Sequence, residues 1–216
     1  MNICPVQKDL YIWYETIILW FEMVNEANKI LKLLIENQEK RFTIRYISMI
    51  RKINYKSAYN AITKLEKEGI IIVERIGNTK SCSFNRNFSP MVYIVEDDRR
   101  QELLSNSDFK VIYNRMKQVC FPFIALIFGS YVKSENNKHS DIDILVITEN
   151  SDKMKEQFSL IPLNIHLTTI SYQEFIAMAK SREFSVVSEA IKKNIIFVGI
   201  EDYYRLLANA EREGGN

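Results

Sequence analysis

Cysteine is scarce in this chain of 216 residues. The three cysteines are far apart, odd in number and without a Cys-x-x-Cys pair, which excludes a disulfide scaffold and a cysteine-based zinc site. A reducing, cytoplasmic location fits this pattern best. With 47% hydrophobic residues, the chain can bury one sizeable core or two small ones. The cysteines are Cys4, Cys82 and Cys120.

A membrane-spanning run is also lacking, so no membrane partner is expected. The apolar stretch at residues 10–24 is interrupted by Glu15 and Glu22 and is shorter than the ~20 residues that span a bilayer. No small-residue cleavage site follows it, and Lys8 is the one basic residue before it, so a signal peptide is not expected. Its aromatic residues instead predict a helix within residues 1–24 that belongs to the core or forms a homodimer interface.

Net charge is small over the whole chain, at +2, but it is unevenly distributed. Residues 40–86 contain eleven Lys or Arg against three Glu, a net charge of +8. The remainder of the chain therefore carries −6. Such a separation of charge is typical of a protein with one segment that binds a polyanion, and residues 40–86 are called the basic segment below.

Residues 25–88 have the pattern of three helices followed by a β-hairpin. The second helix begins after Thr43, and the third carries apolar residues at helical spacing and ends at Gly69. Residues 70–84 contain two β-rich runs separated by a turn at Gly77. The polar and basic residues of the third helix are left on its outward face.

This order of elements resembles that of winged helix-turn-helix domains. The resemblance implies that the third helix enters the major groove of DNA and that the hairpin meets phosphates. Alternatively, the same surface is a solvated positive face used for protein contacts. The residues expected to contact DNA are Lys56, Ser57, Asn60, Lys64, Arg75 and Lys80.

Residues 89–106 are predicted to form a connecting helix that begins near Pro90. The charged cluster in this helix is expected on an exposed surface, and no function follows from it. A Ser-Asn-Ser break at residues 105–107 precedes the second domain, which we place at residues 107–216. The cluster consists of Glu96, Asp97, Asp98, Arg99 and Arg100.

A second pattern carries candidate chemistry. An apolar run at residues 121–128 predicts a buried strand that ends at Gly129-Ser130, and Asp141-Ile142-Asp143 opens the next strand. Successive strand residues alternate between faces, so Asp141 and Asp143 project from the same face beside the Gly-Ser turn. Adjacent carboxylates repel unless a cation lies between them, and Mg²⁺ prefers one or two carboxylates together with phosphate oxygens.

The string GSYVKSENNKHSDIDILV, residues 129–146, resembles the signature of the DNA polymerase β nucleotidyltransferase superfamily, especially its small prokaryotic, archaeal-type members. The resemblance implies transfer of a nucleoside monophosphate from a nucleoside triphosphate to a hydroxyl. It also implies that Asp141 and Asp143 are catalytic and bind Mg²⁺ or Mn²⁺. The nucleotide-binding residues that it implies are Gly129, Ser130, Lys133 and Ser140.

The third carboxylate of that family, which the next strand supplies, is missing. No acidic residue lies between Glu156 and Glu174, and His166 occupies the third position, with Asn164 two residues earlier on the same face. His166 serves as a catalytic metal ligand or general base, or it fills a degenerate site. The sequence leaves both interpretations open.

The sequence therefore predicts an α/β (α+β) protein, in which a winged helix domain precedes a small nucleotidyltransferase-fold domain with a short mixed sheet flanked by helices. Two functions remain. One is a Mg²⁺-dependent nucleotidyltransferase whose winged helix locates it on DNA or on a protein acceptor. The other is a DNA-binding transcriptional regulator, or an antitoxin-like protein with a toxin partner, whose nucleotidyltransferase domain is catalytically degenerate.

Overall fold

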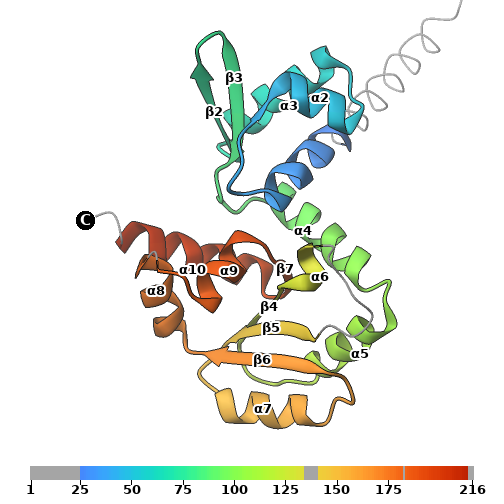
Figure 1. Cartoon of the computed structure of the whole chain (residues 1–216), viewed down its shortest axis with the longest axis vertical. Helices are drawn as coiled ribbons and strands as arrows, with labels where there is room; N and C mark the ends of the chain where they lie inside the picture. The colour runs from blue at the N-terminus through green and yellow to red at the C-terminus, as the bar shows by residue number, and fades with distance from the viewer. Residues whose placement is uncertain (1–24, 134–140, 182, 214–216) are drawn as a thin grey trace, which may run out of the picture. The chain divides into compact units, whose positions relative to one another are not determined.

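The computed structural model describes residues 25–133, 141–181 and 183–213. The chain forms two compact units: Met1–Ile35 with Lys40–Asn85, and Glu36–Glu39 with Arg86–Asn216. We call them the first and second units (Figure 1). The aromatic helix predicted within residues 1–24, with its dimer interface, lies outside the described residues. Among the helices of the described part, none is both long and apolar enough to cross a membrane.

The first unit has the predicted order of helices and hairpin (Figure 1). Its three-stranded antiparallel sheet has the order β1-β3-β2, and β2 and β3 form the hairpin, or wing. The apolar faces of its helices are buried against this sheet. The elements are a helix at residues 25–36, β1 (Phe42–Thr43), α2 (Ile44–Arg51), α3 (Tyr55–Lys67), β2 (Ile71–Ile76) and β3 (Thr79–Phe84).

Local signals fix the ends of these elements. The Thr43 hydroxyl accepts a hydrogen bond from the Tyr46 backbone N–H at 3.2 Å, which caps α2. Asn54 caps α3 in the same way. Gly69 follows the end of α3 with a φ of +69°, a left-handed conformation that glycine adopts without steric cost. The predicted start of the second helix after Thr43 and the predicted glycine stop are thus confirmed, whereas the third helix already begins at Tyr55, which was expected in the connector.

The second unit contains a mixed four-stranded sheet of order β6-β5-β4-β7. β4 runs antiparallel to both β5 and β7, whereas β5 and β6 are parallel. The strands are β4 (Ile124–Phe128), β5 (Ile142–Ile147), β6 (Ile165–Ile170) and β7 (Ile195–Val198). The helices are α4 (Pro90–Leu103), α5 (Ser107–Met116), α6 (Ser130–Lys133), α7 (Ser151–Ser159), α8 (Tyr172–Ser181), α9 (Val186–Lys192) and α10 (Ile200–Glu213).

Helices cover both faces of this sheet. One core joins α5 and α7 to the side chains of Ile142, Ile144 and Val146 on β5. The other face meets α9 and α10, and α10 also contacts α8 and α4 (Figure 1). Because strand residues alternate between faces, Asp143 projects toward the face opposite α5 and α7.

The charged cluster of α4 is not simply an exposed surface, and the prediction was wrong for two of its members. Glu96 and Arg99 are buried, form an ion pair with each other, and are 0% and 4% exposed. The Tyr204 hydroxyl of α10 donates to Glu96 at 2.6 Å. Burial lowers the pKa of Arg99, but the Glu96 charge holds that pKa above its usual value. The Tyr204 hydroxyl, which comes from the far end of the sequence, therefore offsets part of the free-energy cost of burying this ion pair.

Candidate functional site

The edge of the sheet where β4 ends and β5 begins brings the predicted motif together. The antiparallel register pairs Phe128 at the end of β4 with Asp143 near the start of β5. Gly129 follows β4 with a φ of +73°, and Ser130 then begins the short helix α6. The Gly-Ser turn therefore lies beside Asp143, which is more than ten residues away in sequence, and Asp141 precedes Asp143 by two residues.

Gly129 makes room for a carboxylate. A Cβ atom at this position would collide with Oδ2 of Asp143 and lie 3.0 Å from its Cγ. The positive φ also favours glycine. The resemblance implied that Gly129 is a nucleotide-binding residue. In the structure, the Asp143 carboxylate occupies the side of Gly129 where a Cβ atom would project. Sequence spacing did not reveal this contact.

The parallel strand β6 supplies a polar partner for each carboxylate. Its register places His166 beside Asp143, and the two side chains approach at 3.1 Å between Nδ1 and Oδ1. Asn164, which immediately precedes β6, donates from Nδ2 to Oδ1 of Asp141. A carboxylate accepts hydrogen bonds, so Nδ1 of His166 carries the proton toward Asp143 and Nε2 is left as the second ring nitrogen.

Solvent reaches this cluster. The Asp143 and His166 side chains are 26% and 65% exposed, and Asp141 is exposed. The described residues include no group of three or more His, Cys, Asp or Glu arranged to hold a metal ion. Asp141 and Asp143 nevertheless match the ligand set of Mg²⁺, which uses one or two carboxylates and completes its coordination with water and phosphate oxygens. These two carboxylates are therefore suited to a cation whose remaining ligands are water and phosphate oxygens.

The remaining nucleotide-binding candidates are only partly placed. Ser130 is half-buried at the first position of α6, next to Gly129. Lys133 ends α6, and its side chain lies outside the described part of the structure, as does the whole of Ser140.

The DNA-binding candidates lie on α3 and the wing of the first unit. Lys56, Asn60 and Lys64 are spaced by four residues and therefore share one face of α3, where Lys56 and Asn60 are exposed and Lys64 is half-buried. Ser57 on the same helix is also half-buried. On the wing, Arg75 and Lys80 are exposed and directly opposite each other across β2 and β3.

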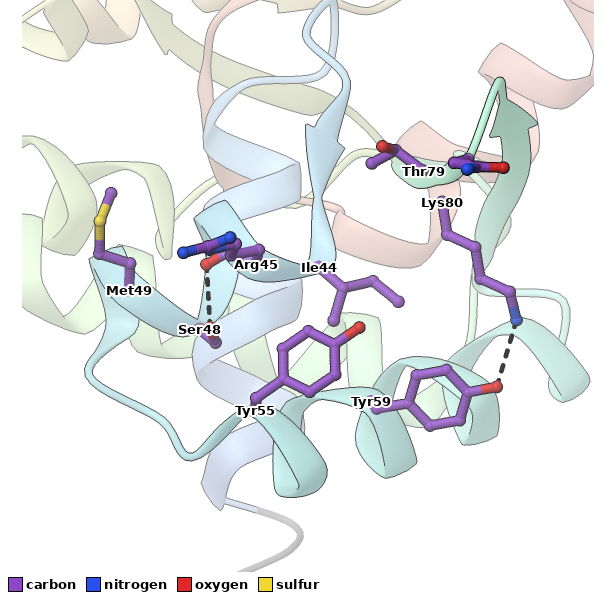
Figure 2. Close-up of a pocket in the computed structure, with 9 residues that line it drawn as sticks. Ile44, Arg45, Ser48, Met49, Tyr55, Tyr59, Thr79 and Lys80 are labelled. Carbon is purple, nitrogen blue, oxygen red and sulfur yellow. Dashed lines mark hydrogen bonds between the residues drawn. The ribbon is translucent and has the colours of Figure 1, made fainter.

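Sequence reasoning missed the aromatic residues of this surface. Tyr55 and Tyr59 of α3 are exposed, and the Lys80 ammonium donates to the Tyr59 hydroxyl at 3.3 Å (Figure 2). The signal was available, because residues 55 and 59 are separated by one helical turn and flank the predicted DNA contacts.

Solved structures similar to the chain include transcriptional regulators. Lactococcus lactis ZitR has 19% identity and a TM-score of 0.31, over 52% of this chain and 84% of its own. The adhesin competence repressor AdcR of Streptococcus pyogenes has 20% identity and a TM-score of 0.32, over 53% of this chain and 83% of its own. Likeness at this level carries no weight for the fold, which rests on the helix order and strand pairing above.

No curated protein matches the sequence. A family model described as "Polymerase beta, Nucleotidyltransferase" matches residues 110–201. This span runs from α5 to the start of α10 and contains Gly129, Asp141, Asp143 and His166. Residues 110–201 are therefore similar to polymerase β-type nucleotidyltransferases, and they are preceded in sequence by a unit with the helix and hairpin order of a winged helix.

Proposed function

We propose that the chain is a nucleotidyltransferase that moves a nucleoside monophosphate from a nucleoside triphosphate to a hydroxyl and requires Mg²⁺ or Mn²⁺. The observation that supports it is that Asp141 and Asp143 both contact polar residues at the start of β6, and that Asp143 also lies against Gly129, within the matched span. Asp141 and Asp143 are the residues that would hold the cation. When bound, it would supply positive charge that offsets the charge of the phosphate groups.

The other residues of the cluster orient these two carboxylates and move a proton. Asn164 and His166 fix one oxygen of each aspartate, which leaves the second oxygen for another partner. Because Nδ1 of His166 faces Asp143, the neutral ring presents Nε2 as a base for the proton of the attacking hydroxyl. His166 would thus take over proton removal at the position where the family has a third carboxylate. Ser130 and Lys133 are suited to bind phosphate oxygens.

Label transfer is the experiment that tests this function. The full chain is incubated with each of the four labelled nucleoside triphosphates and Mg²⁺ or Mn²⁺, alone and with cell extract to supply a nucleic-acid or protein acceptor. We expect transfer by the wild type and none by the Asp141→Asn, Asp143→Asn double variant, which keeps side-chain shape while it removes charge. Asp98→Asn alters an exposed carboxylate on α4 and serves as the matched control. Full activity in the double variant would refute the proposal.

A second candidate is a DNA-binding regulator, or an antitoxin-like protein with a toxin partner, whose transferase domain no longer catalyses transfer. It is favoured by His166 and Asn164 standing where a third carboxylate would complete the site. In this case, nucleotide or DNA binding would persist without label transfer. The two candidates share a DNA-binding first unit and differ only in the chemistry of the second.

Salt-dependent DNA binding tests the part that both candidates share. We expect Lys64→Ala on α3 to weaken binding, and Arg75→Ala on the wing to reduce the slope of log K against log salt by about 0.9 for each lost phosphate contact. Lys110→Ala removes an exposed charge from α5 of the other unit and should leave the slope unchanged. Absence of binding by the wild type at low salt would refute the DNA-binding role.

A further inference from the structure

The first unit contains an open groove of about 900 Å³ between α2, α3 and the tip of the wing. Figure 2 shows its arrangement, with the two tyrosine rings of α3 on one side and the wing residues on another. The buried side chain of Ile44 contributes an apolar surface. We call this space the α2–α3 groove, and the residues that matter most to it are Arg45, Met49, Tyr55, Tyr59 and Lys80.

The groove offers aromatic surface to solvent. Tyr55 and Tyr59 lie one turn apart on the same side of α3 and are 55% and 38% exposed. Met49 of α2, at 66% exposed, adds a further apolar side chain. Large apolar groups that are exposed together, rather than singly, mark contact surfaces. The groove therefore presents a flat apolar face to a ligand.

The charge of the groove is positive. Arg45 and Lys80 line it, and its lining includes no acidic residue among those the structure describes. The Lys80 ammonium lies 5.0 Å from the centre of the Tyr59 ring and donates to its hydroxyl, so a cation is held beside an aromatic side chain. This combination suits a ligand that is both aromatic and anionic.

We propose that the α2–α3 groove binds an unpaired nucleotide of a DNA strand, with the base stacked on Tyr55 and the phosphate near Arg45 and Lys80. The inference rests on the DNA binding proposed above and adds to it the kind of DNA recognised. In the interior of a duplex, neighbouring bases cover both faces of each base, so away from the duplex ends a tyrosine ring can stack only on a base that has left the helix.

The size of the groove agrees with this occupant. Its volume of about 900 Å³ lies in the range of roughly 300–1,000 Å³ typical of sites that enclose whole small molecules. A phosphate alone would leave most of this space and the tyrosine rings unused. Contact with a duplex backbone would explain Arg45 and Lys80 but would leave Tyr55 without a role.

Binding of matched DNA probes tests the inference. Fluorescence anisotropy compares the full chain with a blunt duplex and with the same duplex carrying a single-stranded overhang, at one salt concentration. We expect the wild type to prefer the overhang, and Tyr55→Ala to lose about tenfold in affinity for it while changing little on the blunt duplex. Tyr55→Phe keeps the ring and should retain the preference. Tyr93→Ala, at an exposed tyrosine of α4, is the matched control.

Three results would overturn it. If the wild type binds both probes equally, the inference fails while the DNA-binding proposal stands. If Tyr55→Ala weakens both probes to the same extent, and circular dichroism shows an unchanged fold, then Tyr55 contacts paired DNA instead. If the wild type binds no DNA at low salt, the inference and the DNA-binding proposal fail together.

Discussion

Replacing Gly129 with alanine should disturb the candidate site through two separate effects. The first is backbone strain, because the residue has a φ of +73° that non-glycine residues seldom adopt. The second is a collision, because the new Cβ would meet the Asp143 carboxylate. The two parts separate experimentally because Gly69 has nearly the same φ, +69°, and no heavy atom within 4 Å of a Cβ built on it.

The magnitudes follow from these geometries. A left-handed alanine costs about 1–2 kcal/mol, and the reduced freedom of the unfolded chain returns about 0.4–1 kcal/mol, so Gly69→Ala should destabilise by about 1 kcal/mol. Gly129→Ala carries the same cost plus about 1–3 kcal/mol for overpacking against Asp143. We therefore expect Gly129→Ala to be clearly the more destabilising of the two.

Urea unfolding of a double-mutant cycle measures this coupling. In the Asp143→Ala background Oδ2 and Cγ are gone and only Cβ remains, 3.2 Å from the new Cβ, so Gly129→Ala should cost little more than Gly69→Ala does in the wild type. Binding of Mn²⁺ should weaken in the Gly129→Ala variant, since the carboxylate must move. Equal costs for Gly129→Ala with and without Asp143 would refute the account of this glycine.

Three further predictions concern other parts of the second unit and the core of the first. His166→Asp should strengthen Mn²⁺ binding about tenfold by supplying a third carboxylate, as measured by electron paramagnetic resonance. Tyr204→Phe should lower the free energy of unfolding by about 1–3 kcal/mol, because the buried Glu96 carboxylate loses a donor. Burial raises the pKa of Cys82 to about 11, so at about pH 8 only about one thiol in a thousand is ionised and labelling should favour the exposed Cys120.

Each of these predictions has a control. Thr168→Asp adds a carboxylate on the same face of β6, two residues beyond His166, and should not strengthen Mn²⁺ binding. Tyr93→Phe removes a hydroxyl from an exposed tyrosine and should leave stability unchanged. Labelling of Cys82 in urea should become as fast as that of Cys120; fast labelling of Cys82 in the native protein would contradict its burial.

The parts of the fold that the sequence predicted are those set by neighbouring residues. Thr43 caps a helix through a residue three positions away, and Gly69 ends a helix through its own backbone conformation. The alternation of β5 likewise predicted that Asp141 and Asp143 share a face. The apolar pattern of its strand placed His166 at the third position of the family, and the structure pairs it with Asp143.

The features that the sequence did not predict depend on contacts between residues far apart in the chain. Glu96 appeared to belong on the surface because the buried donor that satisfies it, Tyr204, lies more than a hundred residues later. The close fit of Gly129 to Asp143 depends on the pairing of β4 with β5, which local sequence patterns do not predict. The α2–α3 groove also depends on residues distant in sequence, since Lys80 of the wing contacts Tyr59 on α3.

We propose that Asp141 and Asp143 together hold a cation that binds a nucleoside triphosphate. Equilibrium binding of a fluorescent nucleotide can be measured with Mn²⁺ and again with chelator, in the wild type and in the Asp141→Asn, Asp143→Asn double variant. We expect Mn²⁺-dependent binding by the wild type that the double variant lacks. Binding that is equally tight in the double variant, or that does not depend on the cation, would contradict it.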